Sequence, residues 1–162
     1  MRTSDFPLLR TLAILIIVIG SAAAHATTAC PSNAVCVSDL ATGGAGTSGS
    51  PWTGWETSVN ALGLYTHVHF PAGYYSQASK ITMKEGWLVT GDGSLSESTV
   101  GTGGGTYIQS SFTGTAFYFS RTGNQDRGGV RIEHLTIANS NSSNLGSAIL
   151  TRLTATVHIS NV

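Results

Sequence analysis

The chain has 162 residues, with eight Lys or Arg, eight Asp or Glu and a formal net charge of zero at pH 7. This balance, without a basic stripe, provides no electrostatic footprint for nucleic acid, so we expect no nucleic-acid partner. The length allows one domain. Only 10% of the residues are charged and 20 are glycine, which is typical of an extracellular β protein with many tight turns.

Residues 1–26 have the pattern of a secretory signal peptide. Arg2 and Arg10 form a positive start, Leu12 to Ile19 form an apolar run, and Ala24-His25-Ala26 forms an A-x-A cleavage pattern. A membrane anchor would need about 20 apolar residues, which is more than this run provides. We therefore expect cleavage after the A-x-A pattern, secretion to an extracellular or periplasmic compartment, and no stable membrane anchor.

Residues 27–50 are rich in Ala, Thr, Ser and Gly, and they predict a flexible, exposed lead-in. Cys30 and Cys36 are the only cysteines, and in an exported chain we expect a disulfide between them. A metal site on this pair is not favoured, because no further Cys or His stands at zinc-site spacing. Gly44 to Gly49 matches the G-x-G-x-x-G nucleotide fingerprint, but neither a following helix nor an acidic partner accompanies it, so we expect a glycine loop.

A short amphipathic helix is predicted directly after the lead-in. Thr53 and Glu56 have the spacing of a capping box, in which each side chain bonds a free backbone N–H at the helix start. Trp55, Val59 and Leu62 fall on one apolar face of this helix. Because the rest of the chain favours strands, we expect this face to cover the open end of a stack of coils.

The rest of the chain carries a repeated strand pattern. Val130 to Ile137 alternates apolar and polar residues, and Val157 to Val162 repeats the beginning of that pattern 27 residues later. Trp87 to Gly91 is an earlier copy. Apolar residues two apart share one face of a strand, and the Gly, His or Asn that follows tolerates a bend. A short strand, a bend and a return one coil later predict an all-β solenoid over residues 51–162.

Three pieces of this region, in this order, resemble the pectate-lyase superfamily of pectin-lyase-like proteins. They are Val68-His69-Phe70-Pro71-Ala72-Gly73-Tyr74, then Thr90-Gly91-Asp92-Gly93, then Val130 to Ile137. The resemblance covers about residues 51–162 and implies a right-handed parallel β-helix with three short strands in each coil. It also implies a secreted protein that acts on polysaccharides, either as a pectin-like lyase or as a glycoside hydrolase.

The resemblance places catalysis on the outer face of one sheet near the middle coils. There a lyase uses a basic residue, with calcium or an arginine offsetting the uronate charge, and a hydrolase uses paired carboxylates. The candidate strands for that sheet carry no carboxylate: Ile81-Thr82-Met83, Ala116-Phe117-Tyr118-Phe119 and Ala148-Ile149-Leu150. We therefore expect the catalytic centre, and any calcium, to belong to coils beyond this sequence.

The place where the sequence stops supports the same expectation. Superfamily members run through many coils, whereas this chain stops at Val162, inside the second copy of the repeat. Because an uncapped strand edge is an aggregation hazard, we expect the chain to be the N-terminal part of a longer protein. The alternative function is a non-catalytic β-helix that binds glycans, as an adhesin or a tailspike-like surface protein does. The sequence leaves the oligomeric state open.

Three residues are candidates for contact with a polysaccharide substrate. Arg131 and Glu133 point outward if Val130 and Ile132 point into the core, and His158 then stacks beside Arg131. The alternative is that they form an ordinary solvated face. No catalytic residue, cofactor site or metal site is assigned.

Other polar and aromatic residues favour structural roles. His67 and His69 share one strand face, but two ligands without a third make a poor metal site, so we expect solvent-facing histidines. Asp92 is expected to be a turn residue that bonds its own backbone. Four tyrosines could stack on sugar rings, but packing within the β-helix is favoured for them: Tyr74, Tyr75, Tyr107 and Tyr118.

Overall fold

The computed structural model describes residues 29–93, 104–120, 129–139, 147–152, 157–160 and 162. The predicted signal peptide lies outside the described residues. Within the described ranges, no helix has the length and apolar character that a membrane crossing requires.

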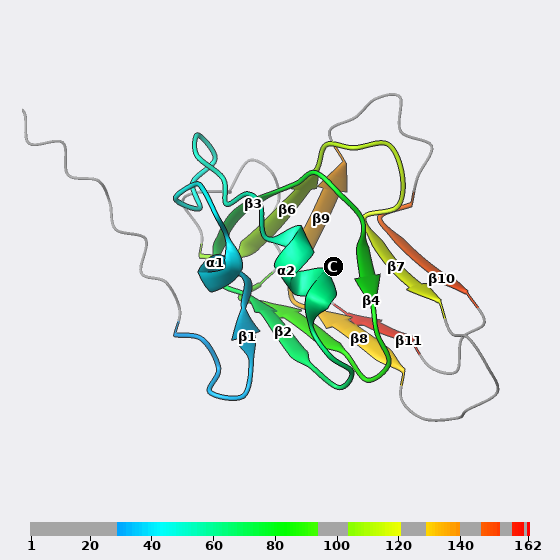
Figure 1. Cartoon of the computed structure of the whole chain (residues 1–162). Helices are drawn as coiled ribbons and strands as arrows, with labels where there is room; N and C mark the ends of the chain where they lie inside the picture. The colour runs from blue at the N-terminus through cyan, green and yellow to red at the C-terminus, as the bar shows by residue number, and fades with distance from the viewer. Residues whose placement is uncertain (1–28, 94–103, 121–128, 140–146, 153–156, 161) are drawn as a thin grey trace, which may run out of the picture.

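Three parallel sheets build the molecule (Figure 1). A five-stranded sheet, in the order β1-β2-β5-β8-β11, contains β1 (Val35–Cys36), β2 (His67–Phe70), β5 (Leu88–Gly91), β8 (Val130–Glu133) and β11 (Val157–Ser160). A second sheet, in the order β10-β7-β4, contains β4 (Ile81–Met83), β7 (Phe117–Ser120) and β10 (Ile149–Arg152). The third, in the order β3-β6-β9, contains β3 (Gly73–Gln77), β6 (Thr106–Ser110) and β9 (Thr136–Asn139). From β2 onward, the chain visits the three sheets in the same rotation, so the fold is a parallel β-helix, as the sequence predicts.

The predicted repeat forms one wall of this helix. Val89 pairs with Ile132, and Ile132 pairs with Ile159, so the copies that align in the sequence are neighbours in one sheet. Val89 and Ile132 are buried, whereas Arg131 is exposed, as the alternation predicts. His134 follows β8 with a φ of 58°, which confirms the predicted bend at this residue.

The core is closed at its N-terminal end by helix α2 (Glu56–Ala61), which lies across the end of the stack of coils in Figure 1. Trp55 and Val59 are fully buried, and Leu62 packs against the same core from a partly buried position. The Trp55 ring meets Phe70 and Tyr75 edge-on, with centroid distances of 5.3 and 6.2 Å. The predicted apolar face of the capping helix is therefore confirmed.

The predicted capping box is wrong. The residue before the helix is Trp55, and it makes no side-chain capping hydrogen bond. The Glu56 carboxylate instead accepts a hydrogen bond of 2.6 Å from the Ala78 N–H, while the Thr53 N–H donates to the Gly43 carbonyl. The buried Glu56 carboxylate is taken by this backbone donor between β3 and β4, so Glu56 anchors the helix to the coils instead of capping it.

The prediction of a flexible lead-in is wrong for residues 35–40. Strand β1 pairs with β2, with Cys36 opposite His69, and helix α1 (Val37–Leu40) places Val37 in the core. The predicted disulfide between Cys30 and Cys36 is present. The lead-in therefore adds a strand to the five-stranded sheet and covers the edge of β2.

Candidate functional site

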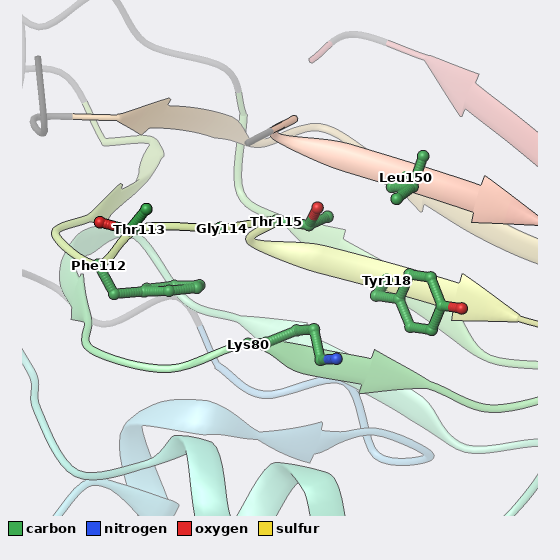
Figure 2. A pocket seen from close by; sticks show the side chains of 7 residues that line it. All are labelled: Lys80, Phe112, Thr113, Gly114, Thr115, Tyr118 and Leu150. Atoms are coloured by element: carbon green, nitrogen blue, oxygen red, sulfur yellow. The ribbon is translucent and has the colours of Figure 1, made fainter. Parts of the chain in front are cut away.

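A groove of about 460 Å³ lies on the outer face of the β10-β7-β4 sheet (Figure 2). Its lining residues come from the position just before β4, from the loop before β7, from β7 and from β10: Lys80, Phe112, Thr113, Gly114, Thr115, Tyr118 and Leu150. The three strands that the sequence selects for a candidate catalytic sheet are thus neighbours in one sheet. The groove lies on the outer face of this sheet.

The alternation of β7 places an aromatic ring in the groove. Phe117 and Phe119 are buried in the core, so Tyr118 between them faces outward. Tyr118 pairs with Leu150 of β10, which is 36% exposed, and the two side chains lie beside each other on this face. The Lys80 ammonium lies 4.9 Å from the centre of the Tyr118 ring, which is a cation–π contact; Figure 2 shows the two side chains.

The groove offers an aromatic face, a cation and threonine hydroxyls, and no carboxylate stands among its described lining residues. These residues therefore provide neither the carboxylate pair of a glycoside hydrolase nor the acidic oxygens that would hold calcium. These groups can bind a polar ligand that has apolar faces.

The prediction that the tyrosines pack within the β-helix is confirmed for three of the four. The rings of Tyr74 and Tyr107 lie 4.8 Å apart, and Tyr75 is fully buried, whereas Tyr118 faces outward.

The three predicted contact residues meet on the outer face of the five-stranded sheet. Arg131 pairs with His158 in the register of β8 and β11. Arg131 Nη2 lies 2.5 Å from Glu133 Oε1, and His158 Nδ1 lies 3.3 Å from the same oxygen. The hydrogen bond from Arg131 lowers the pKa of the Glu133 carboxyl, with further help from the charges of Arg131, His158 and His134. Their role in substrate contact stays a prediction.

Replacing Arg131 with glutamine is expected to lower the free energy of unfolding by less than about 1 kcal/mol, because the Arg131 side chain is 59% exposed and solvent screens the pair. The pKa of Glu133 is lowered in the folded state, so the contribution is present above its ordinary value of 4.5 and is lost as the pH falls through the folded-state pKa. Urea denaturation at neutral and at strongly acidic pH measures this difference. Arg131→Lys, which keeps the charge, is the control, and a difference independent of pH would contradict the assignment.

A second polar cluster lies on the same outer face, between β2 and β5. His67 Nε2 lies 2.8 Å and His69 Nδ1 lies 2.9 Å from Thr90 Oγ1, and His69 Nε2 faces Asp92 Oδ1 at 3.3 Å. His69 is only 4% exposed, so the prediction of solvent-facing histidines is wrong for this residue. Pairing of β2 with β5 places Thr90 directly opposite His69, a contact that the sequence of either strand does not reveal. No group of three or more His, Cys, Asp or Glu suited to a metal ion occurs in the described ranges.

Asp92 bonds residues of other coils, whereas its predicted turn contact falls on Ser94 and the residues after it, which lie outside the described ranges, so it stays a prediction. Its Oδ2 accepts a hydrogen bond of 2.7 Å from the Ala72 N–H, and its own N–H donates to Thr106 Oγ1 at 2.9 Å. The adjacent Gly91 is required by close packing, because a Cβ there would lie 2.6 Å from the His134 carbonyl oxygen. The bend therefore passes close to the next coil, and Asp92 joins two neighbouring bends of the wall.

The sequence did not predict most of the groove or the burial of the histidine cluster. For the groove, a usable signal was present: Tyr118 stands between two core phenylalanines, and Lys80 directly precedes a strand of the same sheet. For the cluster, the signal was the polar Thr90 on a strand that pairs with the two histidines, but their burial depends on the neighbouring coils.

The chain was compared with protein-family models, with curated proteins and with solved structures, and none of them matches. The resemblance to the pectate-lyase superfamily therefore stays a prediction that rests on the three sequence pieces. The parallel β-helix agrees with what this resemblance implies for the fold, but a fold does not determine a function.

Proposed function

We propose that the protein is a secreted carbohydrate-active protein and that its described part binds polysaccharide in the groove of the β10-β7-β4 sheet. The observation that carries this proposal is the cation–π contact between Lys80 and Tyr118 on the outer face of this sheet. An aromatic ring presents a flat apolar face on which the C–H face of a sugar ring can stack. A neighbouring ammonium can form a charge-assisted hydrogen bond to a carboxylate.

The composition of the groove favours an acidic polysaccharide such as a polyuronate. Among the described lining residues Lys80 is the only charged one, so this part of the groove carries a positive charge without a compensating carboxylate. Thr113 and Thr115 add hydroxyl groups that can exchange hydrogen bonds with sugar hydroxyls. A pectin-like chain meets these requirements, since each uronate unit has an apolar ring face and a carboxylate.

Two functions remain in competition, and the groove favours one of them for this chain. A polysaccharide lyase or glycoside hydrolase would need a base with a charge-offsetting group, or two carboxylates, beside the bound sugar. The part of the groove lining that the structure describes contains no such set. Binding without cleavage is therefore the function that the described residues support best, and an enzymatic function would depend on residues outside the described ranges.

The proposal predicts that Tyr118→Ala weakens binding of oligogalacturonate by about tenfold, which corresponds to about 1.4 kcal/mol and is the scale of an aromatic stacking contact. Lys80→Gln should weaken binding of the acidic ligand but not of a neutral galactan oligosaccharide, whereas Tyr118→Ala should weaken both. Isothermal titration calorimetry on the secreted chain measures each dissociation constant.

Two control variants make this experiment specific. Tyr118→Phe keeps the ring and should bind as the native protein does, and Tyr65→Ala removes an exposed tyrosine that lies outside the groove lining. Equal binding by native protein and Tyr118→Ala would contradict the proposal. The ultraviolet absorbance of unsaturated uronate should not rise during incubation with polygalacturonate, and clear product would replace binding with lyase activity.

A further inference from the structure

The Thr90 hydroxyl stands between two imidazole rings, and this position limits the protonation states that the cluster can accept. Its oxygen lies 2.8 Å from His67 Nε2 and 2.9 Å from His69 Nδ1. A hydroxyl has one proton to donate and can accept other hydrogen bonds. Both contacts are therefore satisfied when one imidazole presents a bare nitrogen to Thr90 and the other presents an N–H.

The position of Asp92 assigns the tautomers. His69 Nε2 is buried and faces Asp92 Oδ1 at 3.3 Å, an ion-pair distance without hydrogen-bond geometry. Because a carboxylate stands on this side of the ring, we place the proton of neutral His69 on Nε2, which leaves Nδ1 as the bare nitrogen. Thr90 then donates to His69, and His67 donates to Thr90 from Nε2. In this arrangement His67 Nδ1 is bare, and it is buried without a hydrogen-bond partner among the described residues.

A second proton on either ring breaks this arrangement. On His67 it creates an N–H at the buried Nδ1, where no described group accepts it, and an unsatisfied buried donor is costly. On His69 it removes the acceptor of the Thr90 O–H: the Thr90 oxygen can still accept from both rings, but its own proton loses its partner. We propose that His67, Thr90, His69 and Asp92 form an acid-sensitive latch between β2 and β5, closed while both imidazoles are neutral and opened when either is protonated.

Of the charged groups around the latch, the nearest one, Asp92, favours a protonated His69, so the acid sensitivity comes from burial and the hydrogen bonds and not from these charges. Asp92 is the carboxylate at ion-pair distance from His69, and its other oxygen is held by the Ala72 N–H. On β8, Glu133 is the strand partner of Thr90. Arg131 lies in the same outward-facing row as His67, with Leu88 between them, so two strand spacings, or about 10 Å, separate Arg131 from His67. From β1, Cys36 opposite His69 is in the disulfide and does not titrate.

Burial and the neighbouring histidine lower the pKa of His67, and burial lowers the pKa of His69 more than Asp92 raises it. Both histidines therefore bind protons more weakly in the folded chain than in the unfolded chain, where the ordinary histidine pKa is 6.5. Their contribution to stability is fully present above that value and is lost as the pH falls through the folded-state pKa, because the unfolded chain takes up protons that the folded chain does not.

The first test compares native protein with His67→Gln by urea denaturation of the secreted chain from about pH 7.5 to about pH 5, the range in which histidine changes its charge. A glutamine amide can take the place of Nε2 and donate to Thr90, but it does not titrate. We expect the variant to take up fewer protons on unfolding, by at most about one per molecule, so that its stability falls less steeply with acid. Thr90→Ser keeps the hydroxyl and should retain the native slope. A native slope in His67→Gln would overturn the proposal.

The second test follows the native protein alone and does not depend on the folding of a variant. Amide hydrogen exchange, corrected for the intrinsic effect of pH, should show that acid weakens protection of the β2 and β5 amides and of the Ala72 amide. The β4 and β7 amides are the internal control, because these paired strands contain no histidine. Equal loss of protection in the β2–β5 pair and the β4–β7 pair, or no loss in either pair, would overturn the proposal of a latch.

Discussion

Replacing Trp55 with alanine is expected to lower the free energy of unfolding by about 3–5 kcal/mol, the usual cost of emptying a large aromatic site in a core. Trp55 is fully buried and contacts both Phe70 and Tyr75, at the place where α2 closes the end of the β-helix. Its indole Nε1 has no hydrogen-bond partner among the described residues, so the loss measures packing and not a broken hydrogen bond.

Urea denaturation followed by far-ultraviolet circular dichroism measures this loss. Trp55→Phe should cost much less, because it keeps an aromatic ring against Phe70 and Tyr75. Leu64→Ala is a matched surface control, because Leu64 is 57% exposed near the same helix, and its effect should stay within about 0.5 kcal/mol. If Trp55→Ala lowered the free energy of unfolding no more than this control does, packing of Trp55 beside α2 would not stabilise the core.

Replacing Asp92 with alanine should lower the free energy of unfolding by about 2–3 kcal/mol, the range for removing a charged acceptor and leaving a buried donor unpaired. The variant loses the 2.7 Å hydrogen bond to the Ala72 N–H, and Ala72 is 9% exposed, so water replaces the carboxylate poorly. It also loses the carboxylate that faces His69.

Asp92→Asn is the matched control for this second prediction. Its amide oxygen can still accept from the Ala72 N–H, so most of the stability should return, while the negative charge beside His69 is absent. Chemical denaturation at neutral pH measures both variants. Equal losses for alanine and asparagine would show that the charge, and not the hydrogen bond to Ala72, carries the contribution of Asp92.

The groove and the latch lie on different sheets of the same coils, which makes their tests independent. Tyr118 and Lys80 belong to the side of β4 and β7, whereas His67 and Thr90 belong to β2 and β5. A variant that alters the acid response should therefore leave sugar binding at neutral pH unchanged. Failure of one proposal would not remove the basis of the other.

The solenoid could be predicted because its information is local and repeated. The alternation of Val130 and Ile132 with Arg131 sets the face of each side chain within one strand. The recurrence of the pattern after 27 residues then sets the length of a coil, and β8 and β11 pair in this register. A one-residue slip would expose the whole apolar set, so the register follows from the pattern itself.

Contacts between coils could not be predicted in the same way. Glu56 has the right spacing for a capping box with Thr53, but its carboxylate accepts from the Ala78 N–H once the helix is seated on the coils. His69 occupies an outward position, which normally means solvent, yet Thr90 and Asp92 of the next coil enclose it. In both cases the partner is about 20 residues away in sequence and adjacent only after the chain has completed a coil.

The sequence by itself determined the class of fold, the disulfide, the apolar face of the closing helix and the faces of the repeated strands, because periodicity and burial of apolar side chains act within one element. Only the tertiary structure decided that β1 extends the sheet, that Tyr118 meets Lys80 in a groove, and that Thr90 joins two histidines. The physical reason is that polar side chains have several partners of similar energy. The stacking of the coils selects which of these partners comes within hydrogen-bond distance.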